Sequence, residues 1–291
     1  QDTIQYMPRR FIRDWSAAIH KQYPGYYMVG EVFEEDAAQT AFFQGGRAGW
    51  DGVDTGLPSV FDFKLWRTSQ EVFTGKRPAR ALRDVLKYDG LYPDINRVTV
   101  LANNHDTDRF MSLVGADKAS AKLHSAFILA TRGIPQLYYG EEVLMKGGHD
   151  PANRADMTKF DHSSRTADEQ EMYDWTRRWI ATRRQNPAML TGRTIDILYN
   201  ESVYAFRRVT AADDLLFIFN SSDRPQTVSF DRKEINAVDM GCYFDILIDL
   251  KTGLSSGGRC PDAASSKIEF LLDPKSVTAV KFGNLSVLRA K

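Results

Sequence analysis

Three carboxylates stand out by their positions in the chain. Asp2 lies near the start, Glu31 directly follows an apolar stretch, and Asp106 comes at the end of a second one. Carboxyl groups that are held in different protonation states can serve as acid, base or nucleophile in one reaction. Each of them alone also has a structural explanation, because Glu31 could be a solvated loop residue or a helix cap and Asp106 could cap a backbone turn.

Short apolar segments alternate with longer amphipathic ones up to about residue 190, which is typical of a parallel sheet covered by helices. Strands are predicted at 26–32, 52–57, 98–101 and 136–139, and helices at 8–22, 63–73, 79–88, 118–132 and 168–185. Polar clusters close several of these strands. In parallel α/β folds ligand groups gather at the carboxyl ends of strands, so these clusters mark the candidate site.

From about residue 193 the pattern changes to short alternating segments that are separated by turn-rich stretches. Strands are predicted at 202–208, 215–220, 227–230, 243–249, 267–272 and 276–282. This pattern predicts a small antiparallel β-domain. We therefore expect two domains, at 1–192 and 193–291.

Three segments occur in order and are separated by helix-length spacers: G-E-V-F at 30–33, N-N-H-D-T-D-R-F at 103–110 and G-I-P-Q-L-Y-Y-G-E-E at 133–142. This series resembles the α-amylase family of glycoside hydrolases. The resemblance implies an α/β fold in which residues 1–192 are the carboxyl-terminal part of a catalytic (β/α)8 TIM barrel, from the end of strand 4 to helix 8. Residues 193–291 would then form a small all-β domain, an antiparallel sandwich.

The resemblance assigns a role to each carboxylate. Q-D-T at 1–3 stands where the family continues its Arg-x-Asp motif. The resemblance thus implies Asp2 as nucleophile, Glu31 as acid/base and Asp106 as transition-state stabiliser in a retaining double displacement. The family's Arg would precede Gln1, so we expect the amino-terminal half of the barrel to be missing. We also expect these 291 residues alone to be inactive.

Sugar-binding residues are implied in the same way. The segment G-G-H-D-P-A-N-R at 147–154 resembles the Gly-Gly-Asn-Asp-Pro-x-x-Arg loop of the neopullulanase and cyclomaltodextrinase branch, with His149 in place of Asn. The resemblance implies that Asp150 and Arg154 hold sugar and that His105 donates to sugar hydroxyls. Glu141 and Glu142 are implied to structure a loop.

Aromatic side chains can stack on the C–H face of a sugar ring. Phe33 and Tyr139 are predicted as such platforms, with Trp50 and Tyr138 as further candidates. For all four residues core packing is the alternative explanation.

The implied substrates are starch-type oligosaccharides, pullulan or cyclodextrins, cleaved at α-1,4-glucosidic bonds. Transglycosylation by the same double displacement, and a non-catalytic amylase-fold scaffold or glucan-binding protein, are the alternatives. No cofactor is implied as required, although calcium could bind through the missing regions. A homodimer stays open, and the resemblance favours a bacterial periplasmic or secreted protein.

Composition excludes several other classes of function. Lys+Arg and Asp+Glu both number 38, so no charge excess favours nucleic acid or an anionic membrane. No apolar run reaches the roughly 20 residues of a membrane-spanning helix. Cys242 and Cys260 are not a C-x-x-C pair, so no metal site is predicted. Two free thiols are favoured over a disulfide between them. The disulfide remains an alternative, because sequence alone does not show whether the two Cα atoms come within the roughly 4.4–6.8 Å that such a bond requires.

Overall fold

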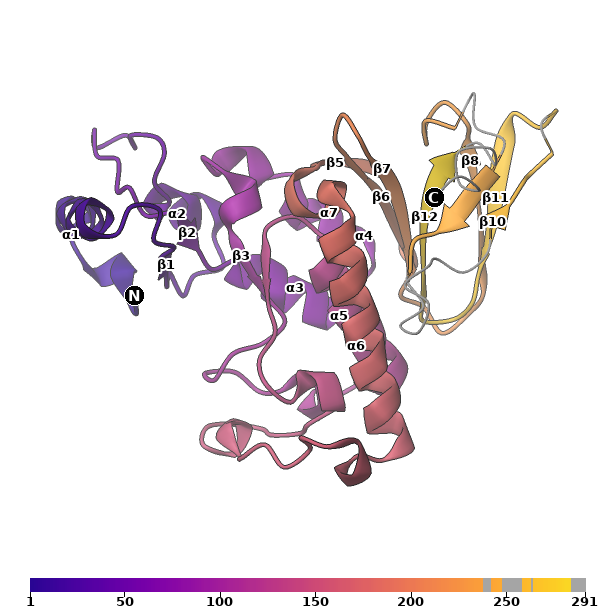
Figure 1. Ribbon diagram of the computed structural model, residues 1–291, viewed down its shortest axis with the longest axis horizontal. Helices are drawn as coiled ribbons and strands as arrows, with labels where there is room; N and C mark the ends of the chain where they lie inside the picture. The colour runs from indigo at the N-terminus through magenta and orange to yellow at the C-terminus, as the bar shows by residue number, and fades with distance from the viewer. Residues whose placement is uncertain (238–241, 248–257, 263, 284–291) are drawn as a thin grey trace.

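The computed structural model describes residues 1–237, 242–247, 258–262 and 264–283. Figure 1 shows the elements spread along one long axis in roughly the order of the sequence. Helix α1 (Arg9–Gln22) lies at one end, the long helix α6 (Ala167–Gln185) crosses the middle, and antiparallel strands form the other end. Within the described part of the chain, no helix combines the length and apolar character needed to cross a membrane.

Four short strands form a parallel arc. They are β1 (Val29–Gly30), β2 (Ser59–Val60), β3 (Thr99–Leu101) and β4 (Ile134–Gln136). β1 pairs with β2, β3 pairs with β4, and a parallel bridge between Phe61 and Thr99 joins the two pairs. The carboxyl ends of all four strands therefore lie at one edge, where Glu31 follows β1 and Asp106 comes shortly after β3.

The strand predicted at 52–57 is wrong, because the extended segment begins only at Ser59. Gly52 and Gly56 have φ values of 74° and 63°, in the left-handed region that interrupts a strand. The Asp54 carboxylate also accepts a hydrogen bond from the Gly56 amide at 2.9 Å, which closes a tight loop. The other three predicted strands overlap β1, β3 and β4, although the observed strands are shorter.

Helices connect and flank the parallel strands. Besides α1 and α6 they are α2 (Ala37–Phe43), α3 (Phe63–Phe73), α4 (Arg80–Leu86), α5 (Lys118–Ala130) and α7 (Pro187–Thr191). The 3₁₀ helices are η1 (Ile4–Tyr6), η2 (Asp89–Leu91), η3 (Ile95–Arg97), η4 (Phe110–Ser112), η5 (Glu141–Val143), η6 (Ala152–Arg154) and η7 (His162–Ser164). Side-chain caps mark several starts: Asp62 accepts from an amide of α3, and capping boxes begin α5 and α6. Helices α2 and α7 were not predicted, and α7, with five residues, is too short to show a periodic pattern.

The antiparallel region contains two packed sheets. A six-stranded sheet has the order β10-β9-β12-β7-β6-β5, and β8 pairs with β11 in a second sheet. The strands are β5 (Arg193–Tyr199), β6 (Val203–Val209), β7 (Asp214–Asn220), β8 (Gln226–Asp231), β9 (Cys242–Asp245), β10 (Gly258–Arg259), β11 (Lys267–Leu272) and β12 (Ser276–Gly283). Part of the strand predicted at 243–249 falls outside the described residues. An all-β region after the helices is thus confirmed.

The large sheet is buried on both faces, which explains its continuous apolar runs. Phe219 of β7 lies 5.7 Å from Phe127 of α5 between ring centroids, so one face packs on the helices. Leu216 and Ile218, which alternate with it, pack with β8 and β11 on the other face. One hydrophobic cluster therefore extends from the helices onto the large sheet, and a second lies between the two sheets.

Cys242 and Cys260 form a disulfide, so the expectation of free thiols is wrong. β9 and β10 pair with Tyr243 opposite Arg259, and the next position of this register places Cys242 opposite Cys260. The Cα atoms of the two cysteines lie 4.0 Å apart. This proximity depends on a strand register that the sequence alone does not reveal.

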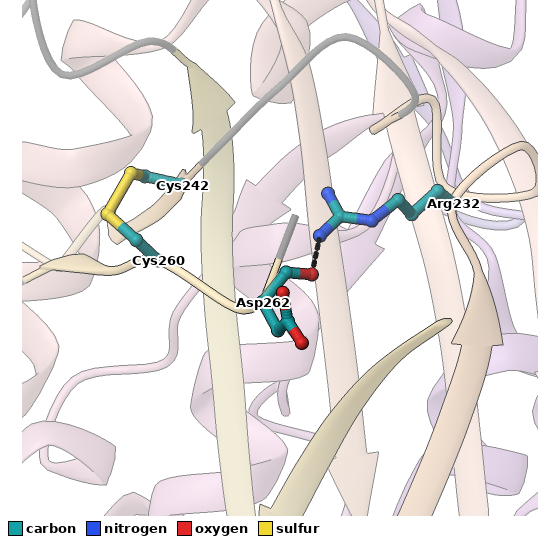
Figure 2. The surroundings of a disulfide bond; sticks show 4 residues. All are labelled: Arg232, Cys242, Cys260 and Asp262. Atoms are coloured by element: carbon teal, nitrogen blue, oxygen red, sulfur yellow. Dashed lines mark hydrogen bonds between the residues drawn. A yellow bond between two sulfur atoms is a disulfide. The ribbon is translucent and has the colours of Figure 1, made fainter. Parts of the chain in front are cut away.

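Arg232, directly after β8, fastens the segment that follows the disulfide. Figure 2 shows its guanidinium group donating to the Asp262 carbonyl oxygen at 2.9 Å, two residues beyond Cys260. A second donation reaches the Ser265 carbonyl oxygen at 2.8 Å. The disulfide and Arg232 together tie the edge of the large sheet to the second sheet.

Replacing both cysteines with serine should lower the free energy of unfolding by about 3 kcal/mol, because the unfolded chain regains the entropy of a loop that the disulfide closes. The two cysteines are 18 residues apart. Urea denaturation of the wild type with and without reductant measures this effect, and reductant should shift the wild-type midpoint to that of the double variant. A wild-type midpoint that does not respond to reductant would contradict the prediction.

Candidate active site

The first residues of the chain lie beside β1 and bring Asp2 next to Glu31. The backbone nitrogen of Gln1 lies 2.7 Å from the Val29 carbonyl oxygen, and the Glu31 amide donates to the Gln1 carbonyl oxygen at 2.9 Å. The Ile4 amide then donates to the Glu31 carbonyl oxygen at 3.0 Å, and the Ile4 side chain is fully buried. Backbone pairing and a buried anchor therefore fix the position of Asp2.

The surroundings of Glu31 favour its protonated form. Partial burial is the main cause of a raised pKa, and a hydrogen bond with the Asp2 side chain adds to it. The Thr3 amide, 3.3 Å from Oε2 of Glu31, acts in the opposite direction. The negative charges of Asp2 and Asp106 raise the pKa further. Glu31 thus stays protonated to a higher pH than an ordinary glutamic acid.

Asp106 lies in a turn after β3 that two buried asparagines stabilise. Oδ1 of Asn103 accepts from the Asn104 amide at 3.0 Å, and Oδ1 of Asn104 accepts from the Asp106 amide at 3.0 Å. Thr107 also donates its hydroxyl to Oδ1 of Asn104 at 3.0 Å. The two asparagines thus cap this turn. The Asp106 carboxylate is partly exposed and lies near the His105 ring.

Arg154 joins several of the predicted site residues. Its Nη2 donates to Oδ1 of Asp106 at 3.0 Å, and its Nε lies 3.1 Å from Oδ1 of Asp150 and 3.0 Å from the His105 carbonyl oxygen. The His105 ring also approaches Asp106, with 3.4 Å between Nε2 and Oδ1. The structure therefore brings Asp106, His105, Asp150 and Arg154 into one cluster, and the charge of Asp106 connects this cluster to Glu31.

A buried layer stands behind this cluster. Arg109 is fully buried, donates from Nη1 to the Tyr139 carbonyl oxygen at 2.5 Å, and lies 3.7 Å from Glu141. Nδ2 of Asn103 lies 3.4 Å from Oε1 of Glu141, and burial raises the Glu141 pKa to about 7. The Arg109 guanidinium also lies 4.5 Å from the centre of the Tyr138 ring. Glu141 and Arg109 therefore brace the turn that carries Asp106.

The predicted aromatic platforms differ in their surroundings. Phe33, two residues after Glu31, is 45% exposed and packs on Phe63 with ring centroids 4.4 Å apart. Tyr139 donates its hydroxyl to the Ala155 carbonyl oxygen at 2.8 Å, close to Arg154 in sequence. Trp50 is 90% exposed and stacks on Phe42 at 5.4 Å. Among the described contacts, none joins Trp50 to the three carboxylates.

Sequence reasoning gave no role to two residues that structure this site. Arg109 lies in the segment 103–110 and Asn153 in the segment 147–154, each beside a charged neighbour. Both side chains are nevertheless fully buried. A charged or amide side chain at a loop position gives no sign of burial in a single sequence. The described residues contain no group of three or more His, Cys, Asp or Glu side chains arranged to hold a metal ion.

Comparisons with known proteins agree with this arrangement. The family described as the α-amylase catalytic domain matches residues 2–191. An α-amylase of Niallia circulans is 29% identical over 261 residues, which are 87% of this chain and 46% of the relative. A cyclomaltodextrin glucanotransferase of Paenibacillus macerans is 28% identical over 251 residues, which are 84% of this chain and 33% of the relative.

A solved α-amylase structure from Anoxybacillus aligns with a TM-score of 0.80 and 20% sequence identity, over 97% of this chain and 58% of that chain. The chain thus spans less than half the length of the two curated relatives. The family match includes all three carboxylates and ends before β5 begins. Because this match takes in well over half of the chain, the chain belongs to the α-amylase family.

Proposed function

We propose that this chain carries the catalytic carboxylates of a retaining glycoside hydrolase that cleaves α-1,4-glucosidic bonds of starch-type oligosaccharides, pullulan or cyclodextrins. Asp2 attacks the anomeric carbon while Glu31 protonates the departing oxygen. Glu31 then removes a proton from water, which displaces Asp2 from the glycosyl-enzyme. Asp106 binds the distorted sugar and stabilises its positive charge in both steps.

The observation that carries this proposal is the electrostatic coupling of the three carboxylates at one edge of the parallel strands. Burial, the hydrogen bond to Asp2 and the charge of Asp106 all raise the pKa of Glu31. A general acid needs this raised pKa in order to remain protonated at its working pH. The other two carboxylates are proposed as nucleophile and stabiliser.

The contact between Asp2 and Glu31 favours retention of configuration. An inverting enzyme separates its two carboxyl groups by roughly 6.5–9.5 Å, which leaves room for a water molecule. Asp2 raises the pKa of Glu31 both through a side-chain hydrogen bond and through its charge, which requires the two carboxyl groups to lie close together. Such proximity fits a nucleophile and an acid/base that act on the same sugar in turn.

The sugar-binding proposals follow from the cluster around Asp106. His105 and Arg154 present ring and guanidinium N–H groups beside Asp106, where sugar hydroxyls could accept them. Asp150 orients the Arg154 guanidinium. Phe33 and Tyr139 are partly exposed aromatic surfaces, which we propose as stacking platforms.

The four parallel strands are proposed to belong to a (β/α)8 barrel. Their parallel order, the helices between them and the likeness to a solved α-amylase support this architecture. Completion of such a barrel requires four further strands, so the activity is proposed for the complete protein.

Transglycosylation is the second candidate, because relatives named cyclomaltodextrin glucanotransferase match the chain as well as those named α-amylase do. Both reactions share the glycosyl-enzyme and differ in whether water or a sugar hydroxyl resolves it. Among the hydrolases of the family, the loop at 147–154 favours the neopullulanase and cyclomaltodextrinase branch.

The test is an assay of the complete protein on soluble starch, pullulan and β-cyclodextrin, with chromatography of the products. Linear maltooligosaccharides as the main products support hydrolysis, and preferred cleavage of pullulan or β-cyclodextrin supports the branch. New cyclic or lengthened products instead support transglycosylation. No product from any of the three substrates would overturn the proposal.

A further inference from the structure

Asn153 forms hydrogen bonds with the backbone on both sides of Asp106. Its side-chain Nδ2 donates to the His105 carbonyl oxygen at 2.7 Å and to the Thr107 carbonyl oxygen at 3.0 Å. Both acceptors are carbonyl oxygens, which only accept, so the amide nitrogen must face them. Two hydrogen bonds from one fully buried amide group therefore fix the peptide units that flank Asp106.

Asn153 is itself held in place. Nε of Arg109 donates to the Asn153 carbonyl oxygen at 2.9 Å, and the Arg109 guanidinium is fully buried. Gly147 closes the other side, since a Cβ added there would lie 2.7 Å from the Asn153 Cα atom. Asn153 thus has little freedom to follow the turn if the turn moves.

We propose that Asn153 is a positioning residue for the reaction: it fixes the Asp106 turn against the loop that carries Arg154. The proposal rests on the proposed function for its effect on turnover. Arg154 follows Asn153 directly and pairs with the Asp106 carboxylate at 3.0 Å. One short segment therefore fixes both the backbone and the charge partner of Asp106.

Loss of these two hydrogen bonds should mainly reduce stabilisation of the transition state. Removal of the Asn153 amide leaves two carbonyl oxygens without their donor, and the turn would move to satisfy them with water. Asp106 would then lie away from the position where charge develops on the sugar. A displacement of about 1 Å in a positioned group can reduce the rate roughly 10²-fold.

Asn220 provides a matched control. It is also fully buried, and its Nδ2 donates to two carbonyl oxygens, those of Arg224 at 2.9 Å and Asp273 at 2.8 Å. It lies at the end of β7, in the antiparallel sheet. Asn220→Ala therefore removes the same two donated hydrogen bonds, and also the two that Oδ1 accepts from Ser222, at a position away from the Asp106 turn.

The kinetic test compares Asn153→Ala, Asn153→Asp and Asn220→Ala in the complete protein. Asn153→Asp keeps the shape but replaces the donor with an acceptor that faces two carbonyl oxygens. Both Asn153 variants should lower kcat on soluble starch about 10²-fold with a much smaller change in KM. Asn220→Ala should keep kcat within about twofold even if it lowers the melting temperature. Equal kcat losses for Asn153→Asp and Asn220→Ala would overturn the proposal.

The pH profile adds a readout that a general loss of stability would not change. Asp2 and Asp106 are the charged groups that act on Glu31, so displacement of Asp106 should move the alkaline limb of kcat/KM to lower pH. In Asn220→Ala this limb should stay where it is in the wild type. An unmoved limb in both Asn153 variants would contradict the displacement of Asp106.

Amide hydrogen exchange tests, without any substrate, whether Asn153 fixes the Asp106 turn. The Asp106 amide donates to Oδ1 of Asn104 at 3.0 Å within the turn, so its protection reports on the order of that turn. Asn153→Asp should accelerate exchange across 105–107, and Asn220→Ala should not. If the wild type is inactive on every α-glucan, only the proposed function is overturned. Unchanged exchange in Asn153→Asp would instead overturn the proposal that Asn153 fixes the Asp106 turn.

Discussion

Replacing Asp2 with asparagine should nearly abolish turnover of starch, with kcat lower by roughly 10⁴-fold or more. An amide is too weak a nucleophile to form the glycosyl-enzyme. The substitution also removes a charge that raises the pKa of Glu31, so the acid/base is affected together with the nucleophile. Steady-state assays of the complete protein on soluble starch measure the loss.

A second variant distinguishes loss of the nucleophile from loss of the fold. In Asp2→Ala, added azide should attack the anomeric carbon directly from the vacated face and yield a glycosyl azide of inverted configuration. Asp14→Asn is the control, since Asp14 is an exposed carboxylate of α1 that pairs with its neighbour Arg13 at 2.8 Å. More than about a tenth of the wild-type kcat in pure, folded Asp2→Asn would contradict the role of Asp2.

Replacing Glu31 with glutamine should lower kcat on starch by roughly 10²–10⁴-fold, which is the usual contribution of a general acid. The loss should depend on the leaving group. An α-glucosyl fluoride releases fluoride without a proton from the enzyme, so formation of the glycosyl-enzyme from this substrate should change far less. Single-turnover measurements with both substrates test this difference.

The pH dependence has a definite sign. Glu31 must be protonated in the free enzyme, and burial, Asp2 and Asp106 raise its pKa. Activity should therefore persist above the range of an ordinary glutamic acid and decline only as the pH passes the raised pKa. Asp106→Asn removes one of the raising charges and should move this alkaline limb to lower pH.

The exposed residue Glu34 provides the matched control for Glu31. Glu34→Gln should keep both the rate and the alkaline limb of the wild type. Equal losses on starch and on the fluoride in Glu31→Gln would contradict proton donation by Glu31. An alkaline limb that survives unchanged in Glu31→Gln would contradict it as well.

Much of the fold followed from local patterns in the sequence. The amphipathic helices α1, α3 and α6 appear where periodicity predicted them, because burial on one face leaves a regular spacing of apolar residues. Strands β6, β7, β8, β11 and β12 also overlap predicted strands, whereas β5 and β10 were not predicted. The parallel strands were harder to bound. They are only two or three residues long, and at 52–57 an apolar pattern coincided with a loop that Gly52 and Gly56 close.

Other features depend on contacts between distant segments. The disulfide requires the register of β9 against β10, which no local signal specifies. The cluster of Asp106 with Arg154 joins positions 48 residues apart. The supporting roles of Arg109 and Asn153 arise because both are buried, although their residue types and loop positions favour exposure.

The most direct test of the account is to identify the residue that becomes glycosylated. The complete protein is incubated with a 5-fluoro-α-glucosyl fluoride, which forms a slowly hydrolysed glycosyl-enzyme, and the digested protein is analysed by mass spectrometry. We expect one fluoroglucosyl unit on the peptide that contains Asp2 and none in the Asp2→Asn variant. Labelling of any other carboxylate, or a first-formed product of β configuration from an α-glucan, would contradict the account.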